Sequence, residues 1–131
     1  MSSEVGSPPR FRMLDHDGRP VVLLDFSGIT DREEGLAAVS SARSFVATLP
    51  RDGSHRTLTD VRRTRYDRSI VEAFKGLTEH NRPYVRAAAV VSDSAIHRAA
   101  ITMIAIFSGR KLAVFDTREG ALEYLAAAPA Q

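Results

Sequence analysis

Short apolar runs alternate with helical patterns along this chain of 131 residues, and this alternation constrains its fold more than any other feature. Each of four runs of strand length precedes a longer segment whose apolar residues recur every three or four positions. The runs cover residues 20–26, 55–61, 84–91 and 111–115, and the helical segments cover 30–49, 67–81, 93–107 and 117–127. Strands and helices in this order predict a parallel sheet whose crossover helices cover it, and therefore an α/β fold.

A β-hairpin is expected before the first helix. Apolar runs at 11–16 and 20–26 flank Asp17-Gly18, a dipeptide typical of tight hairpin turns. Residues 21–24 are continuously apolar, which indicates a strand covered on both faces. The expected order is ββαβαβαβα, a mostly parallel five-stranded sheet with an N-terminal hairpin and four helices in one domain over residues 11–127. Residues 1–10 are expected to form a disordered tail.

Local signals place the helix ends. Thr30 and Glu33 have the spacing of a capping box at the first helix, and Pro50 follows its end. Asp67 is expected to cap the second helix. Pro83 ends that helix, because a proline disfavours helical backbone in the residue before it.

Composition argues against several classes of protein. The chain has no cysteine, which excludes disulfides and thiolate metal sites and suits a reducing cytoplasm. No segment approaches the roughly 20 apolar residues of a membrane span. The net charge of +2 is too small to indicate nucleic acid binding.

The most informative corner joins the strand at 55–61 to the helix that opens at Asp67. Ligands and partners of parallel α/β sheets bind at such corners, and arginine suits bidentate binding of anions. This corner is predicted to bind an anion or the acidic surface of a protein partner; a solvated loop in an arginine-rich chain is the alternative. The candidate residues are Arg62, Arg63, Arg65, Asp67, Arg68 and Ser69.

Three sets of motifs, in this order, resemble the SpoIIAA-like (STAS-like) family. They are Leu24-Asp25-Phe26-Ser27-Gly28; then Leu58-Thr59-Asp60-Val61, Tyr66-Asp67 and His80-Asn81-Arg82-Pro83-Tyr84-Val85; and finally Phe107-Ser108-Gly109-Arg110-Lys111, Val114-Phe115-Asp116-Thr117 and Ala121-Leu122-Glu123-Tyr124-Leu125. The resemblance implies a βα superhelix related to anti-anti-sigma factors and to the lipid-binding CRAL-TRIO fold. The family's phosphorylated serine directly follows the aspartate that Asp67 matches. Arg68 stands at that position here and Ser69 comes one residue later, so the phosphoswitch is not expected.

Three aspartates, Asp25, Asp60 and Asp116, follow or end predicted parallel strands. Carboxylates gathered there could bind a divalent cation or act as acid and base. Strand-end aspartates more often cap turns and helices. Because no histidine has metal-ligand spacing and no nucleotide or nucleophile motif is present, we expect neither an enzyme nor a metal or other cofactor.

The third helix is apolar over most of its circumference, which indicates deep burial or a second partner. Ile96, Met103 and Phe107 are expected to face the sheet. The remaining flank is then predicted to be partly exposed, for a homodimer contact or an apolar ligand; burial under another helix and a membrane surface are the alternatives. The candidate residues on this flank are Ile101, Ile104 and Ala105.

Two functions follow from these features. The first is a non-catalytic cytoplasmic regulatory or protein-interaction module that presents the 62–69 corner. The second is a carrier of a small apolar or lipid-like ligand, with association to a membrane surface but no span through it. The sequence does not name the partner or the ligand.

Overall fold

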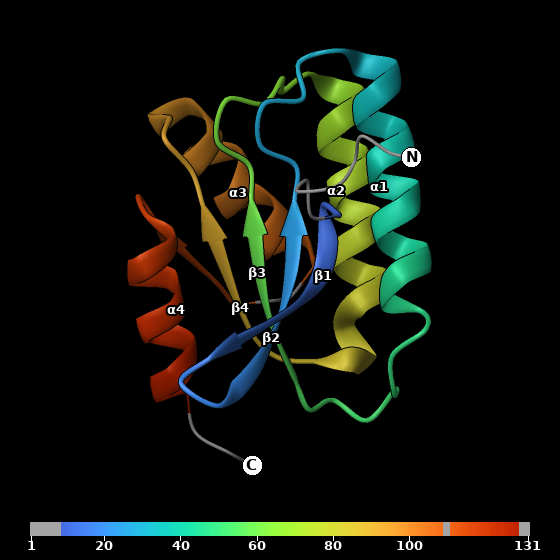
Figure 1. Cartoon of the computed structure of the whole chain (residues 1–131). Coiled ribbons are helices and arrows are strands. Elements are labelled where there is room, and N and C mark those ends of the chain that lie inside the picture. The colour runs from blue at the N-terminus through green and yellow to red at the C-terminus, as the bar shows by residue number, and fades with distance from the viewer. Residues whose placement is uncertain (1–8, 109–110, 129–131) are drawn as a thin grey trace, which may run out of the picture.

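The computed structural model describes residues 9–108 and 111–128, except for the side chains of residues 96, 107 and 108. The strands are β1 (Phe11–His16), β2 (Arg19–Asp25), β3 (His55–Asp60), β4 (Val85–Val91) and β5 (Leu112–Phe115). The helices are α1 (Arg32–Val46), α2 (Arg68–Asn81), α3 (Ala95–Ser108) and α4 (Arg118–Ala127), with a short 3₁₀-helix, η1 (Arg82–Tyr84), between α2 and β4 (Figure 1). The order confirms the predicted ββαβαβαβα arrangement. The tail expected at residues 1–10 lies outside the described residues up to position 8.

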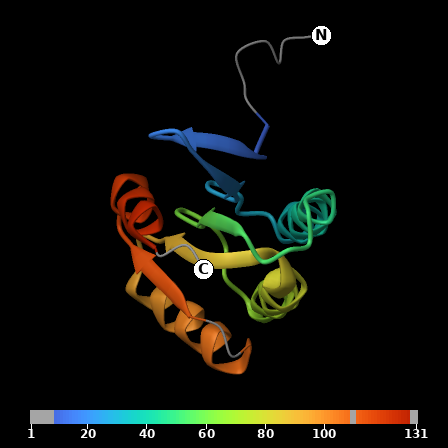
Figure 2. The same cartoon turned by 90° about the horizontal axis from the view of Figure 1, so that it is seen from below.

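The five strands form one mixed sheet in the order β1-β2-β3-β4-β5. β1 pairs antiparallel with β2, and the pairs β2-β3, β3-β4 and β4-β5 are parallel. Figure 2 shows α1, α2 and α3 on one face of the sheet and α4 on the other. Because each crossover helix lies on the same face, the chain steps across the sheet in one direction.

Alternate residues of β2 enter the two cores. Val22 and Leu24 pack with α1, α2 and α3, whereas Val21 and Leu23 pack with residues of α4. Side chains of successive strand residues point to opposite faces, so a strand covered on both sides must be apolar at every position. The prediction from the continuous apolar run is confirmed.

The hairpin turn has the backbone that its sequence predicts. Asp17 has a φ of 53° and Gly18 a φ of 80°. Both central residues of a type I′ turn need positive φ, which glycine adopts freely and aspartate tolerates. The turn sets the register of β1 and β2, in which Leu14 faces Val21.

The start of α1 differs from the prediction by one residue. Its N-cap is Asp31, whose carboxylate accepts the backbone N–H of Glu34 at 2.9 Å. The predicted capping box of Thr30 and Glu33 is therefore wrong, and Thr30 is exposed. Aspartate is at least as good an N-cap as threonine, and it places both glutamates in the first turn, at the positive end of the helix dipole.

The orientation of α3 is the largest departure from the prediction. Ile101 and Ile104 are each only 3% exposed, whereas Met103 is 49% exposed. The flank predicted to be exposed therefore faces the core, and Met103 faces outward instead of the sheet; Ala105 is half-buried. The expectations for Ile96 and Phe107 concern side chains outside those described. Within the described ranges, no helix has the length and apolar character needed to cross a bilayer.

Candidate functional site

Asp60 ends β3 and is held by two arginines at the carboxyl edge of the sheet. Its side chain is fully buried. Oδ1 accepts the backbone N–H and the Nε–H of Arg62, each at 3.1 Å, and Oδ2 accepts Arg62 Nη2 and Arg118 Nε, each at 2.8 Å. We call Asp60, Arg62 and Arg118 the Asp60 clamp. It ties β3 and the following turn to the first turn of α4.

The clamp keeps the Asp60 carboxyl ionised. Burial by itself would raise the pKa of this group, but the hydrogen bonds from Arg62 and Arg118 outweigh that effect and hold the pKa below its usual value. A carboxylate that already accepts four hydrogen bonds is poorly placed to take a proton from a substrate.

The three strand-end aspartates do not form one site. Arg118 joins Asp25 to the clamp, with its Nη2 at 3.2 Å from Asp25 Oδ2. Asp116 lies apart in a pair with Arg98, and its side chain is 82% exposed. Among the described residues, no group of three or more carboxylates and histidines has a geometry that could hold a metal ion.

At the start of α2, Asp67 has the capping role that the sequence predicts. Its Oδ1 accepts the N–H of Ile70 at 3.0 Å, and Oδ2 accepts Arg65 Nε at 2.9 Å and Arg32 Nε at 3.0 Å. The hydrogen bond from Ile70, together with those from Arg32 and Arg65, lowers the pKa of Asp67 to about 2.

The predicted arginine corner is thus divided. Arg62 and Arg65 are paired with Asp60 and Asp67, so their charges are largely neutralised. Arg63 and Arg68 are exposed, and within the part of the chain that the structure describes their side chains have no ion pair. Ser69 is exposed beside Arg68. The corner therefore presents two unpaired cations where the sequence predicted four.

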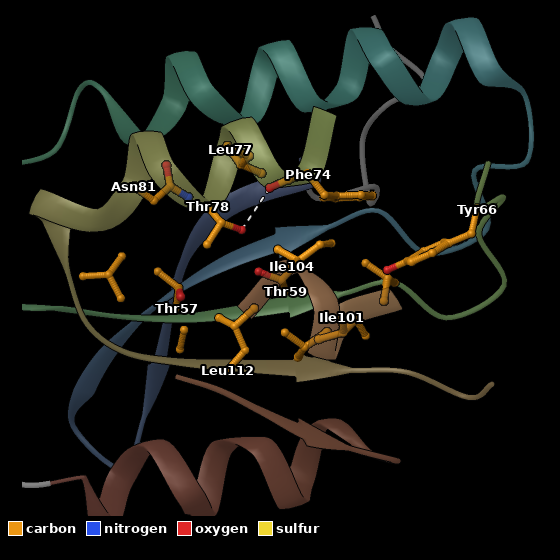
Figure 3. A pocket seen from close by; sticks show the side chains of 14 residues that line it. Thr57, Thr59, Tyr66, Phe74, Leu77, Thr78, Asn81, Ile101, Ile104 and Leu112 are labelled. Atoms are coloured by element: carbon orange, nitrogen blue, oxygen red, sulfur yellow. Dashed lines mark hydrogen bonds between the residues drawn. The ribbon is translucent and has the colours of Figure 1, made fainter. Parts of the chain in front are cut away.

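A cavity lies between the sheet and the helices α2 and α3, and of its lining only Ile101 and Ile104 were predicted as site residues. It has a volume of about 60 Å³, room for roughly two to four water molecules at about 15–30 Å³ each. Phe74 and Leu77 approach it from α2, and Ile101 and Ile104 from α3; Figure 3 shows these side chains converging on it from above and beside the sheet. The two α3 residues predicted for a homodimer contact or an apolar ligand thus line a cavity in the core.

Small and polar residues on the sheet explain why this space is not filled. Thr57 and Thr59 point from β3 to the same face, and Ala88 and Val90 of β4 lie next to them in register. Central strands are usually rich in large β-branched and aromatic residues. Ala88 places only a methyl group where such a residue would fill the space beneath α2 and α3.

Several polar groups around the cavity have no partner among the described residues. Thr57 is 4% exposed and Asn81 8% exposed. No hydrogen bond is found for the hydroxyls of Thr57 and Thr59 or for the amide nitrogen of Asn81. More than nine in ten buried polar groups in proteins are hydrogen-bonded to protein or to ordered water, so such groups beside a cavity indicate that it holds water or a ligand with a polar atom.

Tyr66 closes one end of the cavity. Its ring stacks on His97 at 3.9 Å and on Phe74 at 6.0 Å between ring centroids. Figure 3 shows its hydroxyl directed toward the cavity, and burial raises the pKa of that hydroxyl. Burial likewise lowers the pKa of His97, so the stacked pair is neutral at neutral pH.

A sequence signal for this cavity does exist. Thr57 and Thr59 alternate within a buried strand, and residues 87–89 form a run of three alanines within another. Hydroxyls on an inward-facing strand surface, beside residues too small to fill the core, indicate a polar cavity. Asn81, in contrast, gives no sign in the sequence that it is buried.

Comparisons of the chain with protein-family models, with curated proteins and with solved structures give no match.

Proposed function

We propose that this protein is a non-catalytic binding module that takes a small, mainly apolar molecule into the cavity between α2, α3 and the sheet. The observation that carries the proposal is the Thr57 side chain, which belongs to a residue only 4% exposed, lines the cavity, and makes no hydrogen bond to the described residues. A bound molecule with a polar atom would satisfy this group, and its apolar part would pack against Ile101, Ile104 and Leu112.

Binding without catalysis agrees with the state of the nearby carboxylates. Asp25 and Asp60 both pair with Arg118, and neither of them lines the cavity. The resemblance to SpoIIAA-like domains and the related CRAL-TRIO fold supports the same class of function. We propose a cytoplasmic location for it, in keeping with a chain that lacks cysteine.

The proposal is tested by partly filling the cavity. In Ala88→Val the added methyl groups enter the cavity, whereas in the matched control Ala37→Val they lie on the exposed side of α1. Native mass spectrometry of gently purified protein, and amide spectra recorded under xenon pressure, should show occupancy in the wild type and in Ala37→Val. The same measurements should show it reduced in Ala88→Val. If native mass spectrometry finds no bound molecule and neither xenon nor the ketone probe described below perturbs a cavity residue of the wild type, the binding function is wrong.

A second candidate function is supported by Arg63 and Arg68. Both side chains are exposed and without an ion pair among the described residues, at a corner where α/β proteins commonly meet partners. Arg63→Glu with Arg68→Glu should slow the association with an acidic protein partner and weaken its salt dependence. Arg51→Glu, at an exposed position beyond the end of α1, is the control. Binding that is unchanged at low salt would remove this candidate.

A further inference from the structure

We propose that the cavity ligand is an electrically neutral molecule with a hydrogen-bond-accepting oxygen, held by the Asn81 amide and the Thr57 hydroxyl. This inference rests on the proposed binding function and specifies the chemistry of the ligand.

Neutrality follows from the lining of the cavity. None of the 14 residues around it carries a charge. Transfer of an ion from water into such a site is strongly unfavourable unless an opposite charge receives it. The charged groups of the Asp60 clamp are saturated by one another at the carboxyl edge of the sheet and do not line the cavity. A carboxylate or an ammonium ion would therefore remain uncompensated.

The hydrogen-bonding capacity at one end of the cavity favours an accepting oxygen. Nδ1 of His80 lies 2.8 Å from Asn81 Oδ1 and donates to it when the ring proton is on Nδ1, which leaves both amide protons of Asn81 for the cavity. Thr78 has already used its proton, which it donates to the Phe74 carbonyl at 2.9 Å. Thr57 has a proton to give. Asn81 and Thr57 thus both offer donors at this end of the cavity.

The remaining lining fits an apolar body of limited size. Figure 3 places Asn81, Thr78 and Thr57 at one end of the cavity and Tyr66 at the other, with Ile104 and Leu112 between them. Bonded atoms pack more closely than separate water molecules, so the volume of about 60 Å³ admits roughly four to six non-hydrogen atoms at about 10–15 Å³ each. A short ketone or alcohol has this size and this distribution of polarity.

Four probes of similar size separate the alternatives. Amide spectra would be recorded during titration with 2-butanone, butyrate and n-butylammonium, and under xenon pressure as the apolar reference. We expect 2-butanone to bind with a dissociation constant at least about tenfold below those of the two ions, since neither ion finds a counter-charge in the cavity. The perturbed amides should be those of Thr57, Thr59 and Asn81.

Two variants at one position test the hydrogen bond. Thr57→Val keeps the shape of the side chain and removes its hydroxyl. It should weaken the binding of 2-butanone by about three- to tenfold and leave the binding of xenon unchanged. Thr57→Ser keeps the hydroxyl and should stay within about twofold of the wild type.

Each outcome distinguishes this inference from the proposed function. Suppose that xenon enters the cavity, but 2-butanone binds no more tightly than the ions, or binds Thr57→Val as tightly as the wild type. The cavity is then a binding site, and the inferred ligand chemistry is wrong. If neither xenon nor 2-butanone perturbs the cavity residues, the cavity holds water only and both proposals fail.

Discussion

Asp60→Asn is the substitution for which the structure yields the clearest stability prediction. Asparagine has nearly the same size as aspartate, and its oxygen can still accept the two hydrogen bonds on the Oδ1 side from Arg62. On the other side its amide group would face Arg62 Nη2 and Arg118 Nε, which are both donors. The substitution therefore removes two charge-assisted hydrogen bonds and the buried negative charge, with little change in volume.

The magnitude follows from these two bonds and the exposure of the arginines. Hydrogen bonds to charged groups contribute about 1.5–3 kcal/mol each. The side chains of Arg62 and Arg118 are 28% and 31% exposed, so water can partly replace the two hydrogen bonds that these arginines lose. We expect the free energy of unfolding to fall by about 2–4 kcal/mol, a large part of the 5–15 kcal/mol typical of a domain. The melting temperature should fall by about 10 °C.

The matched control is the same substitution at Asp116. This strand-end aspartate also pairs with an arginine, Arg98, but its side chain is 82% exposed. Exposed ion pairs contribute about 0–1 kcal/mol, so Asp116→Asn should leave stability almost unchanged. Urea unfolding followed by circular dichroism measures both variants. If Asp60→Asn costs no more than Asp116→Asn, the clamp does not stabilise the fold and our reading of the buried carboxylate is refuted.

Three further predictions concern α3, Asp67 and α4. Ile101→Ala should lower the free energy of unfolding in urea by about 2–4 kcal/mol, because it opens a void in the core. Met103→Ala, at an exposed position, should lower it by less than about 0.5–1 kcal/mol. Equal losses would contradict the orientation of α3. Because the folded pKa of Asp67 is lowered to about 2, its contribution to stability is complete above the unfolded pKa of about 3.9. That contribution is lost as the pH falls toward 2, and Asp67→Asn should flatten this part of an acid unfolding profile; an unchanged profile would exclude the effect. Thr117 caps α4, since its hydroxyl oxygen accepts the N–H of Gly120 at 3.1 Å. Thr117→Ala should therefore lower the free energy of unfolding by about 0.5–2 kcal/mol. A loss well below that range would show that the cap is dispensable.

Signals that act between near neighbours in the chain determined the elements of this fold. Asp17-Gly18 specifies the hairpin because only residues that tolerate positive φ can form a type I′ turn. Asp67 caps α2 as predicted, and α2 ends at Asn81, two residues before Pro83. The unbroken apolar run of β2 required helices on both faces of the sheet. Each of these effects operates within a few residues, so it can be read from the sequence.

Tertiary structure alone decided the orientation of α3 and the partners of the arginines. Where a helix is apolar nearly all round, its periodicity does not say which side meets the sheet, and packing against α2 and the sheet turned Ile101 inward. Arg62 was counted as a free cation because its neutralisation depends on Asp60 being buried beside Arg118, which is 58 residues further along the chain. The cavity likewise depends on side-chain volumes from β3, β4, β5, α2 and α3. Distant contacts and summed volumes are properties of the packed molecule, and no local pattern in the chain contains them.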